Sequence, residues 1–244
     1  HLGFDICNDD CCQRYQGISN ITQSTVEASE LTFGQVITYN NKICDARYSK
    51  SCGGITENFE NVWDGNKIPY LSSIKDQNSK GIEYCSADIV PESSLKTYIG
   101  NIDDNGQYYR WNYKINHNEL IQSMKRKLGL DIKRVLKLNP TKIGESGRII
   151  KLNIEFLNID GNSENVEIFS EYQVRNILSP SFLYSSAFTV NKIKDRFILE
   201  GKGWGHGVGL CQIGALGMAL SKKGVKSILS HYYPGIEINT IYNK

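Results

Sequence analysis

The chain has 244 residues, of which 40% are hydrophobic and 22% are charged. Its 28 Lys and Arg residues nearly balance 26 Asp and Glu residues, for a formal net charge of +2, and this argues against a dedicated nucleic-acid or anionic-membrane binder. It also lacks an apolar run of about eighteen residues, so we expect no segment of it to span a membrane.

The first predicted element is a hairpin. Residues 34–39 and 42–48 read as two strands around Asn40-Asn41, a pair that favours a tight turn. The chain is then expected to enter a loop at 49–54. A strand or irregular piece over 107–114 follows.

Residues 118–129 have the pattern of an amphipathic helix. Leu120, Ile121, Met124 and Leu128 share one face, and Gly129 is a stop signal. These apolar residues are therefore expected in the core. His117 is interpreted as a residue of the helix start rather than a ligand.

The remaining elements continue the mixture of strands and helices. Strands are predicted at 148–156 and 165–169 around an Asp-Gly-Asn turn at 160–162, a helix at 170–178, and a strand pair at 188–190 and 195–200. The fold class predicted is α+β, with antiparallel strand pieces and helices around a mixed single core. Three parts are expected: 1–85 and 166–244 as the two halves of a catalytic domain, and 86–165 as an inserted or peripheral subdomain.

The segment Gly201 to Gly217 is the most informative stretch, because it has seven glycines around one His and one Gln. Glycine lets the backbone take positive φ and approach a ligand closely, so the first half is predicted to be a tight binding loop. From Leu210 the apolar residues recur at helical spacing until Lys222-Lys223-Gly224. His206 and Gln212 can hydrogen-bond a hydroxyl or an acetamido group. The alternative is a loop kept glycine-rich for tight helix packing, with a structural His206.

A second block runs from Tyr48 to Glu57 with the sequence Tyr-Ser-Lys-Ser-Cys-Gly-Gly-Ile-Thr-Glu. At a strand end it would present hydroxyl groups, a lysine and open backbone to a cleft. The alternative is a surface turn. Cys52 has no local Cys-His signature of a thiol nucleophile.

Seven cysteines, an odd number, fit a disulfide framework poorly. His1, Cys7, Cys11 and Cys12 are residue types that select zinc, although their spacing is not that of a zinc finger. A Cys7–Cys12 disulfide that leaves Cys11 free is the competing interpretation.

The glycine segment, the 228–235 sequence Ile-Leu-Ser-His-Tyr-Tyr-Pro-Gly and the 48–57 block together resemble the stage II sporulation protein D family of peptidoglycan lytic transglycosylases. The resemblance implies a groove for peptidoglycan glycan strands, in which the glycine segment and the 48–57 block are expected to converge. The substrate-binding residues that it implies are Tyr48, Ser49, Lys50, Ser51, Gly53, Gly54, Thr56, Trp204, Gly205, His206 and Gln212.

The implied reaction cleaves the bond between N-acetylmuramic acid and N-acetylglucosamine and leaves 1,6-anhydro ends. One carboxylic acid can serve both steps. In the family that acid is a Glu in a Val-Val-x-Gly-Glu-like segment, which would lie upstream of His1, so no catalytic residue is assigned in this chain. We expect the chain alone to bind weakly and to cleave nothing.

The resemblance also implies a zinc ion near the groove, held by His1, Cys7 and Cys12. It further implies an extracytoplasmic protein, with a single membrane anchor upstream of His1, and a sporulation amidase as partner during engulfment. Two alternatives to a lytic transglycosylase stay open: a noncatalytic glycan-binding module and a zinc-dependent cell-wall hydrolase.

Overall fold

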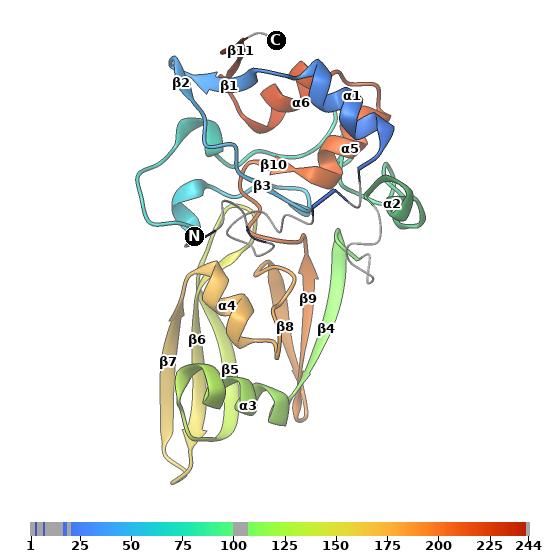
Figure 1. Ribbon diagram of the computed structural model, residues 1–244. Helices are drawn as coiled ribbons and strands as arrows, with labels where there is room; N and C mark the ends of the chain where they lie inside the picture. The colour runs from blue at the N-terminus through green and yellow to red at the C-terminus, as the bar shows by residue number, and fades with distance from the viewer. Residues whose placement is uncertain (1–2, 4–6, 8–16, 19–20, 100–106, 243–244) are drawn as a thin grey trace.

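The computed structural model describes residues 3, 7, 17–18, 21–99 and 107–242. Figure 1 shows two lobes stacked end to end. We call residues 21–99, 107–109 and 203–242 the upper lobe and residues 110–202 the lower lobe. The chain enters and leaves the lower lobe side by side, because the Gly203 N–H donates to the Tyr109 carbonyl at 3.1 Å.

The upper lobe holds short strands and four of the helices in the described chain. In order these are α1 (Gln23–Leu31), β1 (Gln35–Tyr39), β2 (Lys42–Ile43), β3 (Tyr48–Ser49), α2 (Glu92–Ile99), β10 (Leu210–Cys211), α5 (Gln212–Leu220), α6 (Val225–Tyr232) and β11 (Glu237–Thr240). Strand β1 lies between β11 and β2 in an antiparallel sheet. Strands β3 and β10 form a separate parallel pair.

The lower lobe consists of two antiparallel sheets and two helices. Its elements are β4 (Arg110–Asn116), α3 (His117–Leu128), β5 (Ile132–Ile143), β6 (Ile149–Asn158), β7 (Ser163–Phe169), α4 (Glu171–Ile177), β8 (Phe188–Ile193) and β9 (Arg196–Lys202). The sheet orders are β4-β9-β8 and β5-β6-β7. Helices α3 and α4 pack against the second sheet, and α3 also contacts β4.

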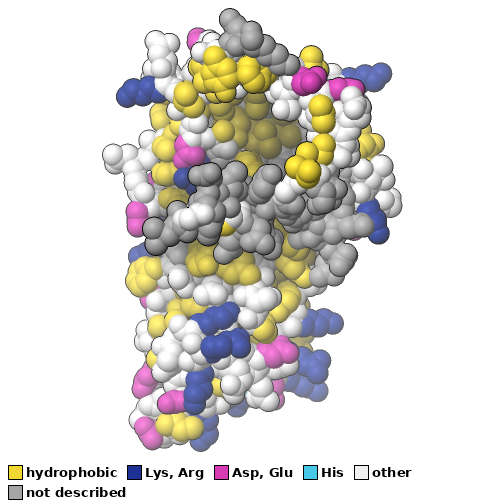
Figure 2. Space-filling model, in the orientation of Figure 1, with side chains coloured by type: hydrophobic (Ala, Val, Ile, Leu, Met, Phe, Trp, Pro, Cys, Tyr) yellow, Lys and Arg dark blue, Asp and Glu magenta, His cyan; other side chains and the backbone are white. Residues whose placement is uncertain are grey.

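The α+β class predicted from the sequence is confirmed, but the buried side chains form two clusters rather than one core. One cluster belongs to the lower lobe and includes Trp111, Leu120 and Ile154. The other belongs to the upper lobe and includes Leu71 and Tyr232. Figure 2 shows hydrophobic side chains gathered on one face of the upper lobe and charged side chains scattered over the lower lobe.

The elements with strong local signals form where they were expected. Asn40 and Asn41 take φ of 50° and 61°, as a tight hairpin turn between β1 and β2 requires. Helix α3 begins with a capping box between Asn116 and Glu119 and ends at Gly129 with φ of 69°. His117 is its first residue, and its Nε2 accepts the Val135 N–H at 3.1 Å.

Elements that depend on distant partners were missed or misjudged. Strand β5, which pairs along β6, was not expected, nor was β11, which pairs with β1 across the sequence. The second hairpin strand ends at Ile43, and β3 starts as a separate strand at Tyr48.

Candidate functional site

The two sequence blocks meet in the structure. Ser51 and Trp204 exchange backbone hydrogen bonds, with the Ser51 N–H to Trp204 O distance at 3.1 Å and the Trp204 N–H to Ser51 O distance at 2.7 Å. Directly beside them Tyr48 pairs with Leu210 and Ser49 with Cys211 in the β3–β10 ladder. The predicted convergence of the two loops is therefore confirmed.

Close packing accounts for glycines of both blocks. Gly53 has φ of +76°, and a Cβ there would lie 2.8 Å from the Gly203 nitrogen. Gly207 has φ of +78°, and a Cβ there would lie 2.3 Å from Cζ of Arg148. These two glycines are therefore needed for contact between the loops and with Arg148, whatever binds to the surface.

Arg148 joins both loops from below. It is fully buried, with Nε donating to Gly205 O at 3.1 Å, Nη1 to Cys52 O at 3.3 Å and Nη2 to Ser51 O at 3.5 Å. A guanidinium presents several donors in a rigid plane, so one side chain can satisfy carbonyls of two segments. No local sequence signal marks this residue, because it stands in an ordinary strand pattern.

His206 is half-buried beneath the exposed edge of the site. Its Nδ1 accepts the Val208 N–H at 3.1 Å, and its ring packs edge-on against Trp63 at 4.8 Å. Burial, and then the positive charges of Arg148 and other arginines, lower the pKa of His206 to about 3. The imidazole is therefore neutral at physiological pH and is oriented by the backbone.

The exposed predicted residues lie around the β3–β10 pair. Tyr48 is 38% exposed, and Gln212 is exposed at the first position of α5. Lys50 places its Nζ 5.6 Å from the ring centre of Tyr108, and its carbonyl accepts the Ile213 N–H at 3.1 Å.

Trp204 is half-buried in an aromatic row. It stacks on Tyr184 with ring centres 4.4 Å apart and an interplanar angle of 20°, and it contacts Tyr108 edge-on at 4.9 Å. Rows of this kind combine a rigid apolar face with polar tips, which suits the face of a sugar ring.

The other predicted residues form the interior of the loops. Ser49, Ser51, Gly53, Gly54 and Thr56 are buried, and Gly205 is half-buried. Thr56 Oγ accepts the Ile74 N–H at 2.8 Å. These residues are enclosed within the loops, so only the more exposed members of the predicted set are open to solvent.

Glu57, at the end of the 48–57 block, is a fully buried carboxylate. It accepts the Asn58 N–H at 2.9 Å, the Asn61 amide at 2.8 Å and the Ser146 hydroxyl at 2.5 Å. These bonds tie the upper lobe to the loop before β6. A solvated surface position, the simplest expectation from the sequence for an acidic residue beside the Gly-Gly block, is therefore wrong for Glu57.

Of the predicted zinc ligands, His1 and Cys12 lie outside the described residues, and Cys7 is half-buried. That site stays a prediction. Within the described residues the structure assembles a different set of metal-ligand types, which was not predicted from the sequence: Cys52, Asp76, Cys85 and Cys211.

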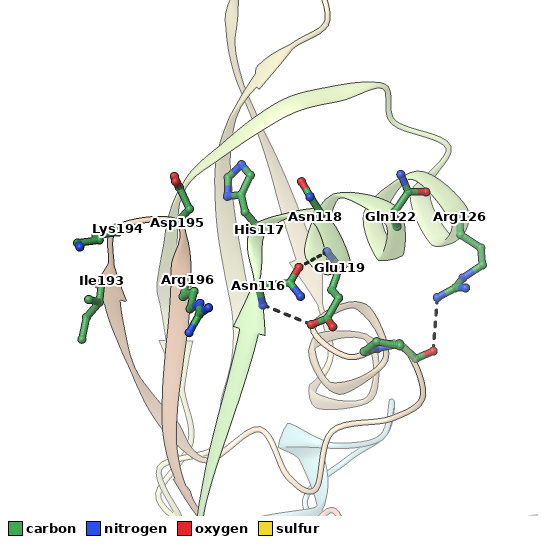
Figure 3. Close-up of a pocket in the computed structure, with 11 residues that line it drawn as sticks. Asn116, His117, Asn118, Glu119, Gln122, Arg126, Ile193, Lys194, Asp195 and Arg196 are labelled. Atoms are coloured by element: carbon green, nitrogen blue, oxygen red, sulfur yellow. Dashed lines mark hydrogen bonds between the residues drawn. The ribbon is translucent and has the colours of Figure 1, made fainter.

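A pocket of about 1200 Å³ lies at the far end of the lower lobe, away from both blocks. Figure 3 shows its polar wall, formed by the start of α3 and the β8–β9 turn, with Asn116, Glu119 and Asp195 among its residues. Capping hydrogen bonds of α3 occupy Asn116 and Glu119. No sequence motif falls here.

None of the helices in the described ranges is both long and apolar enough to cross a bilayer.

Comparisons with known proteins cover almost the whole chain. An uncharacterized protein of Brachyspira hyodysenteriae is 32% identical over 97% of this chain and 54% of its own length. An amidase enhancer of Bacillus subtilis is 27% identical over 93% of this chain and 34% of its own, and a stage II sporulation protein D of Bacillus amyloliquefaciens is 25% identical over 85% and 48%. The chain thus spans between about a third and about half of these curated relatives. A family model described as a domain of unknown function (DUF8618) matches residues 57–209, more than half of the chain, and the chain therefore belongs to this family.

Proposed function

We propose that this chain is the glycan-binding body of a peptidoglycan lytic transglycosylase that acts in sporulation. The observation that carries the proposal is the pairing of Ser51 with Trp204, which joins the two blocks into one surface. The names of the relatives, stage II sporulation protein D and amidase enhancer, support a role beside a cell-wall amidase outside the cytoplasm.

The residues around β3 and β10 would make different contacts with the glycan. Tyr48 and Gln212, both exposed, offer a hydroxyl and an amide to sugar hydroxyls and acetamido groups. Trp204 offers a ring face, and Lys50 an ammonium donor. His206 would act as a positioning residue, because the Val208 N–H occupies its Nδ1.

The chemistry of cleavage needs a carboxylic acid at the scissile bond. Glu57 is enclosed by hydrogen bonds, so it is not our candidate. We propose that the acid comes from a part of the protein outside this chain.

Binding is tested with peptide-free glycan strands and the purified chain. We expect the Tyr48→Ala and Gln212→Ala variants to lose several-fold in affinity. Tyr172→Ala and Gln173→Ala are the matched controls, because both residues are exposed on α4 of the lower lobe. Equal affinity in all four variants, or no binding by the parent chain, would refute the proposal.

The reaction is tested by incubating peptidoglycan with the chain together with the part proposed to supply the acid, and by mass spectrometry of the products. Anhydromuramic ends support a transglycosylase. Intact strands with retained binding would instead indicate the noncatalytic module, and new reducing ends a hydrolase. An amidase assay on whole sacculi, with and without the protein, tests the partner: we expect amide cleavage to rise when it is added.

A further inference from the structure

A buried cluster of three thiols and one carboxylate lies directly behind the paired blocks. Cys52, Asp76, Cys85 and Cys211 are each at most 1% exposed, and their ligand atoms all lie within 4.8 Å of one another. They come from four separate segments of the upper lobe. Buried groups of this kind are expensive unless they are paired, hydrogen-bonded or bound to a metal.

The distance between the sulfurs of Cys52 and Cys85 matches a single tetrahedral ion. With metal–sulfur bonds of about 2.3 Å, two sulfurs of a tetrahedral zinc site lie roughly 3.7–3.8 Å apart. The Sγ atoms of Cys52 and Cys85 are 3.7 Å apart, and Oδ2 of Asp76 lies 3.2 Å from Cys52 Sγ. A disulfide would need about 2.05 Å between the sulfurs.

Backbone amides point at the sulfurs. The Gly54 N–H donates to Cys52 Sγ at 3.3 Å, and the Gly214 N–H donates to Cys211 Sγ at 3.3 Å. The Cys52 N–H donates to Cys211 Sγ at 3.2 Å. Cys211 also caps the N-terminus of α5, where the helix dipole favours a negative sulfur. The surroundings therefore suit thiolates.

The carboxylate is oriented by its outer oxygen. Oδ1 of Asp76 accepts the Tyr232 hydroxyl at 2.7 Å and lies 3.4 Å from Nε2 of His231. This leaves Oδ2 directed into the cluster. Metal ligands are commonly held by such a second layer of hydrogen bonds, which fixes the ligand before the metal binds.

A positively charged side chain near the cluster can offset part of the negative charge of the ligands. Three thiolates, one carboxylate and a divalent ion together carry a net charge of −2, because the thiol protons are released when the metal binds. Arg148, fully buried, donates to the Cys52 carbonyl and offsets part of this charge.

We propose that Cys52, Cys85, Cys211 and Asp76 together bind one zinc ion in a closed, structural site. Four protein ligands leave no position for water, so the ion stabilises the fold rather than performing catalysis. Cys52 belongs to the first block and Cys211 to the second, so the ion would fasten the two loops to each other. This inference is independent of glycan binding, and its ligands differ from the N-terminal set predicted from the sequence.

The first experiment uses the unmodified chain and zinc-edge X-ray absorption spectroscopy. We expect about one zinc per chain with three sulfur neighbours at about 2.3 Å and one oxygen neighbour. A site of His1, Cys7 and Cys12 would instead give two sulfurs and an imidazole. Failure of the chain to retain zinc after reconstitution, or an intact disulfide among the three cysteines under denaturing alkylation, would overturn the proposal.

The second experiment separates the ligands by substitution and measures bound zinc by mass spectrometry. Cys52→Ser, Cys85→Ser and Cys211→Ser should each lower zinc retention at least about tenfold, as loss of a thiolate ligand weakens binding. Cys44→Ser is the matched control, since Cys44 is buried in the same lobe outside the cluster. Cys7→Ser should retain zinc. Loss of zinc in Cys7→Ser with retention in Cys85→Ser would contradict the assignment.

Discussion

The guanidinium of Arg148, which stands just before β6, donates through Nε to the carbonyl oxygen of Gly205 in the glycine segment at 3.1 Å. The same side chain reaches the carbonyls of Cys52 and Ser51. One residue of the lower lobe therefore bridges both blocks of the upper lobe.

Replacing Arg148 with Lys should destabilise the protein by about 2–4 kcal/mol, because an ammonium cannot satisfy three fixed carbonyls that are buried. Urea unfolding measures the change in free energy. Arg134→Lys is the control, since that residue forms an exposed pair with Asp195. If Arg148→Lys loses no more free energy of unfolding than Arg134→Lys, Arg148 does not stabilise the protein by bridging the two blocks.

Replacing Gly207 with Ala should cost more than the same change at Gly161. Both glycines have positive φ, of +78° and +87°, so both variants carry the backbone strain of about 1–3 kcal/mol. Only at position 207 would the new methyl group also meet the Arg148 guanidinium, whereas nothing lies within 4 Å at Gly161. The difference in melting temperature between the two variants measures the effect of the clash with Arg148. Equal decreases in melting temperature would argue against that clash.

Replacing Glu57 with Gln should lower stability by about 2 kcal/mol, since the new amide group would face N–H donors that now have an acceptor. The donors are Asn58, Asn61 and Ser146. Glu200→Gln, an exposed substitution on β9, serves as the control. We expect the midpoint of urea unfolding to fall in Glu57→Gln and not in Glu200→Gln. Identical midpoints would contradict the stabilising role of the hydrogen bonds to Glu57.

Acid should destabilise the protein in part through His206. Its pKa falls from the ordinary 6.5 to about 3 on folding, so between these values the unfolded state binds more protons. This contribution to stability is complete above pH 6.5 and is lost as the pH falls toward 3. Melting temperatures measured across this range should fall less steeply for His206→Gln than for the parent, and parallel curves would be evidence against the shift.

Removal of the proposed zinc should loosen the two blocks together. We expect a chelator to lower the melting temperature and to speed hydrogen exchange at the Gly54 and Gly214 amides, which donate to cysteine sulfurs. The Gly129 amide, bonded to Lys125 in the lower lobe, is the internal control. Re-addition of zinc should restore protection at both sites, and unchanged exchange would argue that the cluster holds no ion.

Local chemistry explains what could be predicted from the sequence. Asn40-Asn41 and the Gly129 cap act over a few residues, so their effect is visible without the fold. The convergence of the two blocks was foreseen from the family resemblance. Strand β11 carries no such signal, because its partner β1 lies at the other end of the chain.

The thiol cluster was missed for the same reason. Its members lie 24, 33 and 159 residues from Cys52, a spacing that matches no local metal motif. One signal was available: Cys52 and Cys211 stand inside the two blocks that were expected to meet. Asp76 and Cys85 had no comparable signal, since pairings between distant segments, such as the backbone bridges of 55 to 75 and 77 to 83, bring them there.

The Gly203 N–H donates to the Tyr109 carbonyl, so the chain leaves the upper lobe and re-enters it at the same place. The lower lobe is therefore an insertion in the upper lobe. An insertion of this kind can be replaced, or can change in length, during evolution while the rest of the chain keeps its path. Arg148 and Ser146 limit that freedom, because they reach back across the junction to the carbonyls of the paired loops and to Glu57. A replacement module would have to supply equivalents of these two side chains.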